Sequence, residues 1–119
     1  MEATDSSTFE VREIAAADGV AQVLLIGELD LAGVAKLDEC LERLRRAGTP
    51  VRLDLSELRF IDSSGLRALV TSRRDSEQNA WRLEIGTELC PQVRKLVDLT
   101  GLGPTLWPES GDGAQPASD

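Results

Sequence analysis

The chain has 119 residues, enough for one compact domain, and its 41% hydrophobic and 29% charged residues are typical of a globular protein. The net charge is −8 and no cluster of Lys and Arg with interleaved aromatic residues occurs, which argues against a nucleic-acid-binding protein. Because the chain contains no histidine, Ser-His-Asp and Cys-His catalysis are excluded, and a transition-metal site is not expected.

The start of the chain and the cysteines bear on the compartment. The first residues are polar and acidic, unlike a signal peptide, and no run of about 18 apolar residues occurs. Cys40 and Cys90 stand alone, with neither a CxxC pair nor metal-ligand spacing, and are interpreted as small buried hydrophobic residues in a reducing compartment. A cytoplasmic protein without membrane contact, cofactor or metal is therefore expected.

A β-hairpin is predicted after residues 1–8, which are expected to be disordered. Alternating apolar residues from Phe9 predict a short strand, and Asp18-Gly19 is a turn signal that brings the next strand back. Residues 20–29, VAQVLLIGEL, form the most apolar run of the chain. Their β-branched content predicts a central strand that is buried on both faces.

A helix and another strand follow. Asp30 is a candidate N-cap for a helix whose apolar residues recur at spacings of three and four, and Pro50 ends the helical segment. Alternation predicts a strand over 51–55. A short acidic connection is expected after it, held down by the apolar residues Leu58, Phe60 and Ile61.

The rest of the chain repeats this alternation. A second helix is predicted over 63–78, a strand over 81–85, and a third helix that begins near Pro91 and ends at Gly101. Residues 108–119 are rich in Gly, Pro, Ser and acidic residues and are expected to be a disordered tail.

The order β-β-α-β-α-β-α predicts an α/β fold with one domain over 9–107. The expected architecture is a small mixed, mostly parallel sheet of about four to five strands packed with about three to four helices. Because working residues of such folds collect at the carboxyl ends of the strands, Asp30 and Ser63 are expected at the same edge of the sheet.

Residues 62–65, DSSG, admit two interpretations. Short oxygen-bearing side chains at a helix start cap backbone N–H groups that lack an intrahelical partner. A serine hydroxyl at such a place is also accessible to a kinase, and phosphorylation would add roughly −1.5 to −2 charges. Asp62 is likewise either a cap or a partner contact, and Gly65 suits close packing.

Three segments together resemble the STAS domain of bacterial anti-sigma factor antagonists. They are GELD at 27–30, LDLSELRFIDSSGL at 53–66 and CPQVRKLVDLTGL at 90–102. The resemblance covers about residues 9–107 and implies a stand-alone STAS domain, a phosphoprotein of transcription regulation that acts through protein–protein interaction.

The resemblance implies a partner switch. In such antagonists the serine directly after the motif aspartate, here Ser63, is phosphorylated by the anti-sigma factor, which is itself a serine kinase. The unphosphorylated antagonist binds the anti-sigma factor and releases the sigma factor, phosphorylation switches binding off, and a PP2C-type phosphatase reverses it.

Asp30 and Asp62 match family positions near the partner surface, and Glu28 is a weaker match. With the residues around the phosphorylation site, the expected partner-binding set is Glu28, Asp30, Asp62, Ser63, Ser64, Gly65 and Arg67. Arg67 departs from the family, where many relatives carry a small residue. Four residues after Ser63, it either partly neutralises a phosphoserine or is a solvated arginine.

An enzyme is not expected, because no G-x-S-x-G elbow and no phosphate-binding glycine loop occurs. The alternative is a STAS scaffold or accessory subunit, in a stressosome-like assembly or with a lipid-transport ATPase, that no anti-sigma kinase regulates.

Overall fold

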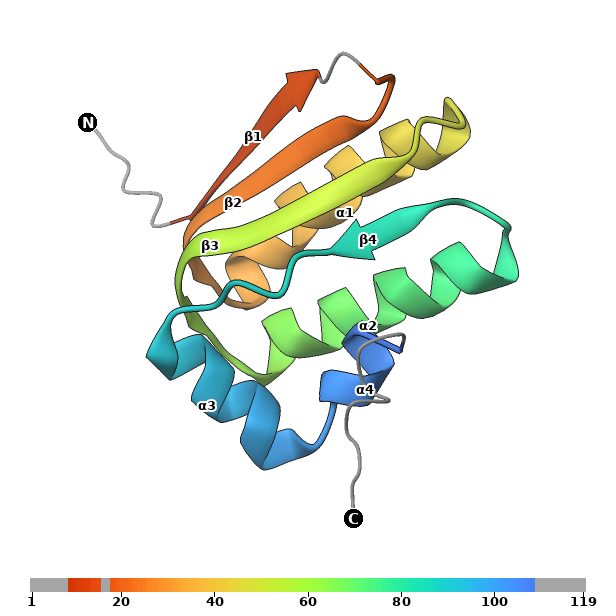
Figure 1. Ribbon diagram of the computed structural model, residues 1–119. Helices are drawn as coiled ribbons and strands as arrows, with labels where there is room; N and C mark the ends of the chain where they lie inside the picture. The colour runs from red at the N-terminus through yellow and green to blue at the C-terminus, as the bar shows by residue number, and fades with distance from the viewer. Residues whose placement is uncertain (1–8, 16–17, 109–119) are drawn as a thin grey trace, which may run out of the picture.

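A computed structural model describes residues 9–15 and 18–108. A four-stranded sheet in the order β1-β2-β3-β4 forms its centre (Figure 1). Strand β1 (Phe9–Ala15) pairs antiparallel with β2 (Ala21–Leu29), and the strands β3 (Val51–Ile61) and β4 (Leu83–Ile85) continue the sheet in parallel. The predicted N-terminal hairpin and mostly parallel sheet are confirmed.

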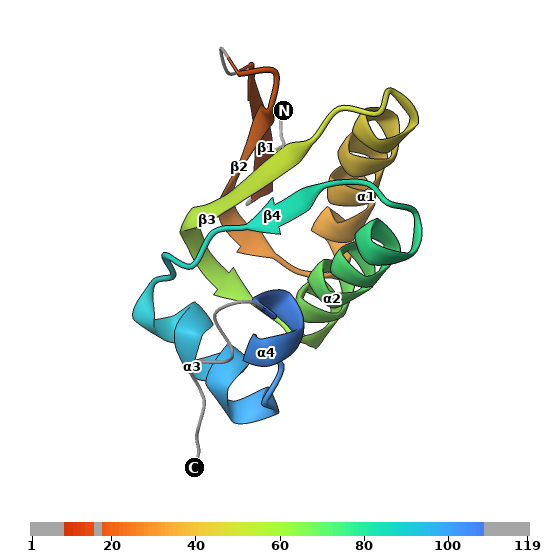
Figure 2. The ribbon, with the colours of Figure 1, turned by 45° about the vertical axis from the view of Figure 1, so that its right-hand side comes forward.

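Four helices accompany the sheet. Helices α1 (Leu31–Arg46) and α2 (Ser63–Gln78) lie side by side on one face of it (Figure 2). Helix α3 (Pro91–Thr100) packs against β3, and the short helix α4 (Gly103–Leu106) packs against α2. The segments expected to be disordered lie outside the described residues, apart from Pro108, so the domain bounds stay a prediction.

Aliphatic side chains fill the space between the sheet and the two long helices. The largest fully buried ones come from the strands, both long helices, α3 and α4: Val23, Leu25, Leu29, Leu37, Val51, Leu53, Leu55, Leu58, Leu69, Leu83, Val93 and Leu106. Since burying one such side chain contributes about 1.5–3 kcal/mol, this layer holds α1 and α2 in place relative to the strands.

The prediction that residues 20–29 are buried on both faces is wrong. Along β2, buried residues alternate with half-exposed ones, among them Leu24 and Ile26. The cause is the topology, because right-handed crossovers place α1 and α2 on the same face of the sheet. The opposite face, here called the open face, therefore stays accessible to solvent.

The acidic connection predicted after residue 55 is also wrong, because β3 continues to Ile61. Its second half pairs with β2, where Glu57 lies opposite Ile26 and Phe60 opposite Glu28, across two register shifts. Such irregularities bend the strand and re-aim side chains, which sequence alternation alone does not predict. Phe60, expected to hold the connection down, is instead 45% exposed.

Candidate functional site

The starts of α1 and α2 lie next to each other at the carboxyl edge of the sheet. They follow β2 and β3, which are parallel neighbours with Leu29 opposite Ile61. The backbone N–H of Asp62 donates a hydrogen bond to the carbonyl of Leu29 at 3.2 Å, which ties the second helix start to the end of β2. The predicted proximity of Asp30 and Ser63 is therefore confirmed.

Asp62 caps α2. Its backbone is extended, with φ −104° and ψ −175°, and its Oδ1 accepts a hydrogen bond from the N–H of Gly65 at 2.9 Å. Ser63 is thereby the first residue of the helix rather than its cap, and its side chain is exposed. Within the described part of the chain, the Ser63 hydroxyl makes no hydrogen bond, so no structural role is evident for this hydroxyl.

Gly65 permits a close contact between the helix start and the sheet. A Cβ atom at this position would lie 2.5 Å from the carbonyl oxygen of Leu29 and 2.9 Å from Cγ1 of Ile61. Both neighbours belong to the ends of the central strands, so a larger residue would push α2 away from the edge that it shares with α1. Gly65 therefore positions Ser63 without contacting a ligand itself.

The start of α1 has the same construction. Asp30 is extended and its Oδ1 accepts from the N–H of Gly33 at 3.2 Å. Gly33 is buried, and a Cβ there would meet the Phe9 ring at 2.8 Å. The sequences are Asp-Leu-Ala-Gly at 30–33 and Asp-Ser-Ser-Gly at 62–65, so the cap and the packing glycine recur while the hydroxyls do not.

A groove of about 440 Å³ runs between the first turns of the two helices. Ser63, Ser64 and Arg67 line it from α2, and Leu31 and Asp38 line it from α1. Arg67 is exposed, and no ion pair of its guanidinium is recorded among the described residues. The groove thus joins an exposed hydroxyl, a cation and an apolar side chain on one surface.

Asp38 brings an acidic group to the far end of this groove. Partial burial raises the pKa of its carboxyl group, and the nearby carboxylate of Asp75 raises this pKa further. The groove therefore carries an acidic group on α1 as well as the cation Arg67 on α2.

The structure does not bring every expected residue into the groove. Glu28 lies opposite Phe60 on the open face and lines a separate hollow of about 350 Å³ with Arg59 and Gln92. Asp30 is the N-cap of α1 and lies next to the groove, because the residue after it, Leu31, is a lining residue. Of the expected residues at the start of α2, Ser63, Ser64 and Arg67 line the groove, whereas Asp62 and Gly65 are not among its lining residues.

Leu31 is a surface residue to which the sequence analysis gave no role. It is 72% exposed at the first position of α1 and lines the groove with Ser63. Its position directly after an N-cap, outside the buried stripe of Leu37, Leu41 and Leu44, is the sequence signal that could have identified it.

The described residues show neither a metal-binding cluster nor a membrane-spanning helix. No group of three or more His, Cys, Asp or Glu side chains has a metal-binding arrangement there. None of the helices described here combines the length and apolar character that crossing a membrane requires.

Known proteins resemble this chain in sequence and in fold. Residues 13–107 match the family model "Mlab, STAS domain". The anti-sigma-B factor antagonist of Staphylococcus epidermidis is 34% identical over 86 residues, which cover 71% of this chain and 79% of that protein.

Two solved structures extend the comparison. The crystal structure of an anti-sigma factor antagonist from Mycobacterium paratuberculosis has a TM-score of 0.66 at 27% identity, covering 90% of this chain and 88% of that chain. The phosphorylated form of the Bacillus cell fate determinant SpoIIAA has a TM-score of 0.61 at 23% identity, over 89% of this chain and 100% of that chain. The second likeness bears on the fold alone.

Proposed function

The chain belongs to the STAS domain family, and from this premise we propose that it is an anti-sigma factor antagonist. The names of the staphylococcal relative and of the mycobacterial structure support the proposal. The unphosphorylated protein binds an anti-sigma factor that is a serine kinase, so that the sigma factor is released. Phosphorylation of Ser63 ends this binding, and a PP2C-type phosphatase restores it.

The observation that carries the proposal is the division of labour at the start of α2. Asp62 supplies the cap and Gly65 supplies the close packing, so the fold has no need of a hydroxyl at Ser63. Ser63 is exposed at the mouth of a groove, where a kinase active site has access to it. Ser64 is only half-exposed, which favours Ser63 as the acceptor.

A phosphate on Ser63 acts differently on the domain and on its complex. Within the domain, the first turn of α2 presents free N–H groups and the positive end of the helix dipole, which stabilise an added anion. Against a partner surface the same dianion, beside the carboxylate of Asp62, is desolvated and repelled. A coupling of about 1–3 kcal/mol changes partner affinity by roughly 5–150-fold, enough for a switch.

Asp30 and Asp62 have a second role in this proposal. Each caps a helix with one carboxylate oxygen, Oδ1, while the side chain stays half-exposed at the partner-facing edge. Their negative charge favours approach of basic groups on the kinase, an effect that acts on the association rate more than on affinity. Glu28, outside the groove, adds to the same field from the open face.

Arg67 reduces the effect of phosphorylation on binding, because it partly neutralises the phosphate. It lies one helical turn after Ser63 on the same groove, where a guanidinium pairs with a phosphate at the i,i+4 position. Phosphorylated Arg67→Ala is therefore expected to bind the anti-sigma factor more weakly than the phosphorylated wild-type protein. Equal affinities of the two phosphorylated proteins would make Arg67 a solvated residue without a role in the switch.

The proposal is tested by phosphorylation in vitro. The protein is incubated with a cognate anti-sigma kinase and ATP, and the site is identified by mass spectrometry of peptides. Phosphate on Ser63, and its loss in Ser63→Ala but not in Ser64→Ala, is the expected result. Phosphate on another residue, or undiminished phosphorylation of Ser63→Ala, contradicts the assignment.

The second candidate is an accessory STAS subunit, favoured by the "Mlab" model that residues 13–107 match. In that case the groove binds a transport ATPase rather than a kinase, and Ser63 stays unmodified. Pull-down with the separate candidate partners distinguishes the two functions, because only the antagonist loses its partner when Ser63 is phosphorylated. In both functions the chain acts by binding, and no catalytic residue is assigned to it.

A further inference from the structure

The two edges of the sheet differ in how their backbone groups are covered. At one edge is β4, with three residues, and at the other is β1, with seven. An edge strand presents backbone N–H and C=O groups that can pair with another strand, and proteins often cover such edges with side chains.

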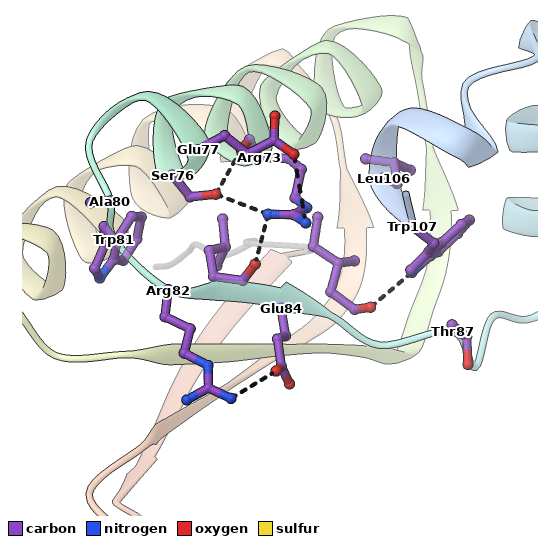
Figure 3. Close-up of a pocket in the computed structure, with 12 residues that line it drawn as sticks. Arg73, Ser76, Glu77, Ala80, Trp81, Arg82, Glu84, Thr87, Leu106 and Trp107 are labelled. Carbon is purple, nitrogen blue, oxygen red and sulfur yellow. Dashed lines mark hydrogen bonds and ion pairs between the residues drawn. The ribbon is translucent and has the colours of Figure 1, made fainter. Parts of the chain in front are cut away.

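Side chains of α2 and of the segment after α4 cover the β4 edge (Figure 3). The Arg73 guanidinium donates to the Leu83 carbonyl at 3.4 Å and to the Ser76 hydroxyl at 3.1 Å. The indole N–H of Trp107 donates to the Ile85 carbonyl at 2.8 Å. A further strand would have to displace both side chains, so this edge is closed to strand addition.

Among the described residues, side-chain cover of the β1 edge is found at the beginning of the strand. Lys36 of α1 donates to the Phe9 carbonyl at 3.3 Å. Farther along the strand, no side chain of the described residues forms a hydrogen bond with the main chain of Val11, Arg12 or Glu13. This stretch is long enough to pair with another strand, and its own side chains decide which strand fits.

The charged side chains of β1 could pair with those of another strand on the side of β1 that faces away from β2. Glu10 and Arg12 are each 55% exposed and pair with each other along the strand at 2.9 Å. Across β2 they face Ile26 and Leu24, which carry no charge. A cross-strand ion pair of Glu10 or Arg12 would therefore have to form on the other side of β1, where the described residues place no strand.

A second copy of β1 fits that requirement in one antiparallel register. With a two-fold axis at Val11, Glu10 of each copy faces Arg12 of the other copy, which gives two cross-strand ion pairs. Glu13 then faces Phe9 of the other copy, so the flexible Lys36 side chain has to leave the Phe9 carbonyl, and the Glu13 carboxylate is already held by Arg43 of its own chain. An axis at Arg12 or at Glu10 would instead bring like charges together on the axis.

We propose that β1 is a self-association edge: two copies pair antiparallel through β1 about a two-fold axis at Val11, joining two four-stranded sheets into one. The contact is a single strand pair, and the surface area that it buries is smaller than that of stable complexes, about 1,200–2,000 Å². The dimer is therefore expected to form in a concentration-dependent manner. Because α2 packs over β3 and β4, whereas β1 contacts α1, a contact through β1 leaves Ser63 of each copy accessible.

Sedimentation equilibrium over about a hundredfold range of concentration tests the proposal. The wild-type protein is expected to change from monomer to dimer within that range. Glu10→Arg places two arginines opposite each other at both pairs, and a dissociation constant weakened at least about tenfold is expected. Glu10→Arg combined with Arg12→Glu reverses both charges of each pair and should restore the wild-type value.

The β4 edge offers a control. Arg82, the residue directly before β4, forms an i,i+2 ion pair at 3.6 Å with Glu84 of β4, so Arg82→Glu reverses a charge at the other edge of the sheet. This variant should dimerise like the wild-type protein. A wild-type monomer at every concentration, or equal weakening by Arg82→Glu and Glu10→Arg, would overturn the proposal.

Cross-linking tests the register independently of affinity. Residues on a two-fold axis of antiparallel strands face each other at Cα distances of about 4.5–5.5 Å, within reach of a disulfide. Val11→Cys should therefore form a disulfide-linked dimer on mild oxidation, whereas Ile14→Cys, three residues from the axis, should not. Cross-linking of Ile14→Cys with none of Val11→Cys would contradict the register.

Discussion

The starts of α1 and α2 form a natural internal comparison. Both follow a central parallel strand, both are capped by an aspartate, and both pack a buried glycine at the third helical position against the sheet. They differ at the first helical position, which is Leu31 in α1 and Ser63 in α2. Since α1 forms without a hydroxyl at this position, the serine of α2 is free to serve a purpose other than folding.

The same comparison separates structural residues from functional ones. Substitutions at the aspartates and glycines should affect the stability of the domain, and those at the aspartates also the association rate with the partner. Substitutions at the first helical positions should affect what the domain binds. The predictions below test this division, beginning with the change expected to have the largest effect.

Gly65→Ala should lower the free energy of unfolding by about 2–4 kcal/mol, because the added methyl group would lie 2.5 Å from a backbone oxygen, that of Leu29. The matched change Gly33→Ala meets the Phe9 ring, which can shift, and gains about 1 kcal/mol of helix propensity, so a net loss of at most about 1 kcal/mol is expected. Urea denaturation measures both. A larger loss for Gly33→Ala would contradict the account of the two packing glycines.

Asp62→Ala and Asp30→Ala should each lower the free energy of unfolding by about 1 kcal/mol through loss of the cap. Asp62→Ser supplies another capping oxygen and should recover most of the loss. If Asp62→Ala were neutral while Ser63→Ala was destabilising, the serine rather than the aspartate would be the cap, and the division of roles at α2 would be wrong.

Asp38, in the groove between the two helices, and Asp54, on the open face, should respond to pH with opposite signs. The raised folded-state pKa of Asp38 penalises the native state above that pKa, so Asp38→Asn should raise the melting temperature slightly at neutral pH. The gap to the wild-type protein should close as pH falls below the ordinary value of 3.8.

Hydrogen bonds from the side chain and the N–H of Ser56 lower the pKa of Asp54, so its ionised form stabilises the native state. Asp54→Asn should therefore lower the melting temperature at neutral pH, and this loss should disappear as pH falls from the ordinary 3.8 through the lower folded-state pKa. Thermal unfolding followed by circular dichroism measures both variants. Shifts of the same sign would show that local contacts do not govern these carboxylates.

Ser63→Ala and Leu31→Ala should have the smallest effect on folding. Both side chains are exposed, and changes in the free energy of unfolding within about 0.5 kcal/mol are expected. Leu99→Ala is the control for Leu31→Ala, because the two leucines are 73% and 72% exposed and only Leu31 lines the groove. A weaker affinity for the anti-sigma factor is expected for Leu31→Ala alone.

Much of the fold follows from local patterns in the sequence. The span of α2, the cap at Asp30 and the glycine exit of α3, where Gly101 has φ 71°, are confirmed because caps, helical spacing and left-handed glycines are local signals. The open face and the continuation of β3 to Ile61 were not predicted, since they depend on which face the helices cover and on register shifts with β2.

The candidate site was predictable in part. The motif at 62–65 identified the helix start, but the roles of its aspartate and serine stayed open until the hydrogen bond from Gly65 to Asp62 assigned the cap. Leu31 was not predicted because its exposure depends on how α1 packs against the sheet. Glu28 was included, although the alternation of β2 places it on the open face, where it lines another hollow.

The most direct measurement is titration calorimetry of the anti-sigma factor with three forms of the protein: unmodified, phosphorylated on Ser63, and Ser63→Asp. The account predicts tight binding of the unmodified protein, weakening of roughly 5–150-fold by the phosphate, and a smaller weakening by the aspartate. Equal affinity of the unmodified and the fully phosphorylated protein, both shown to be folded, would contradict it.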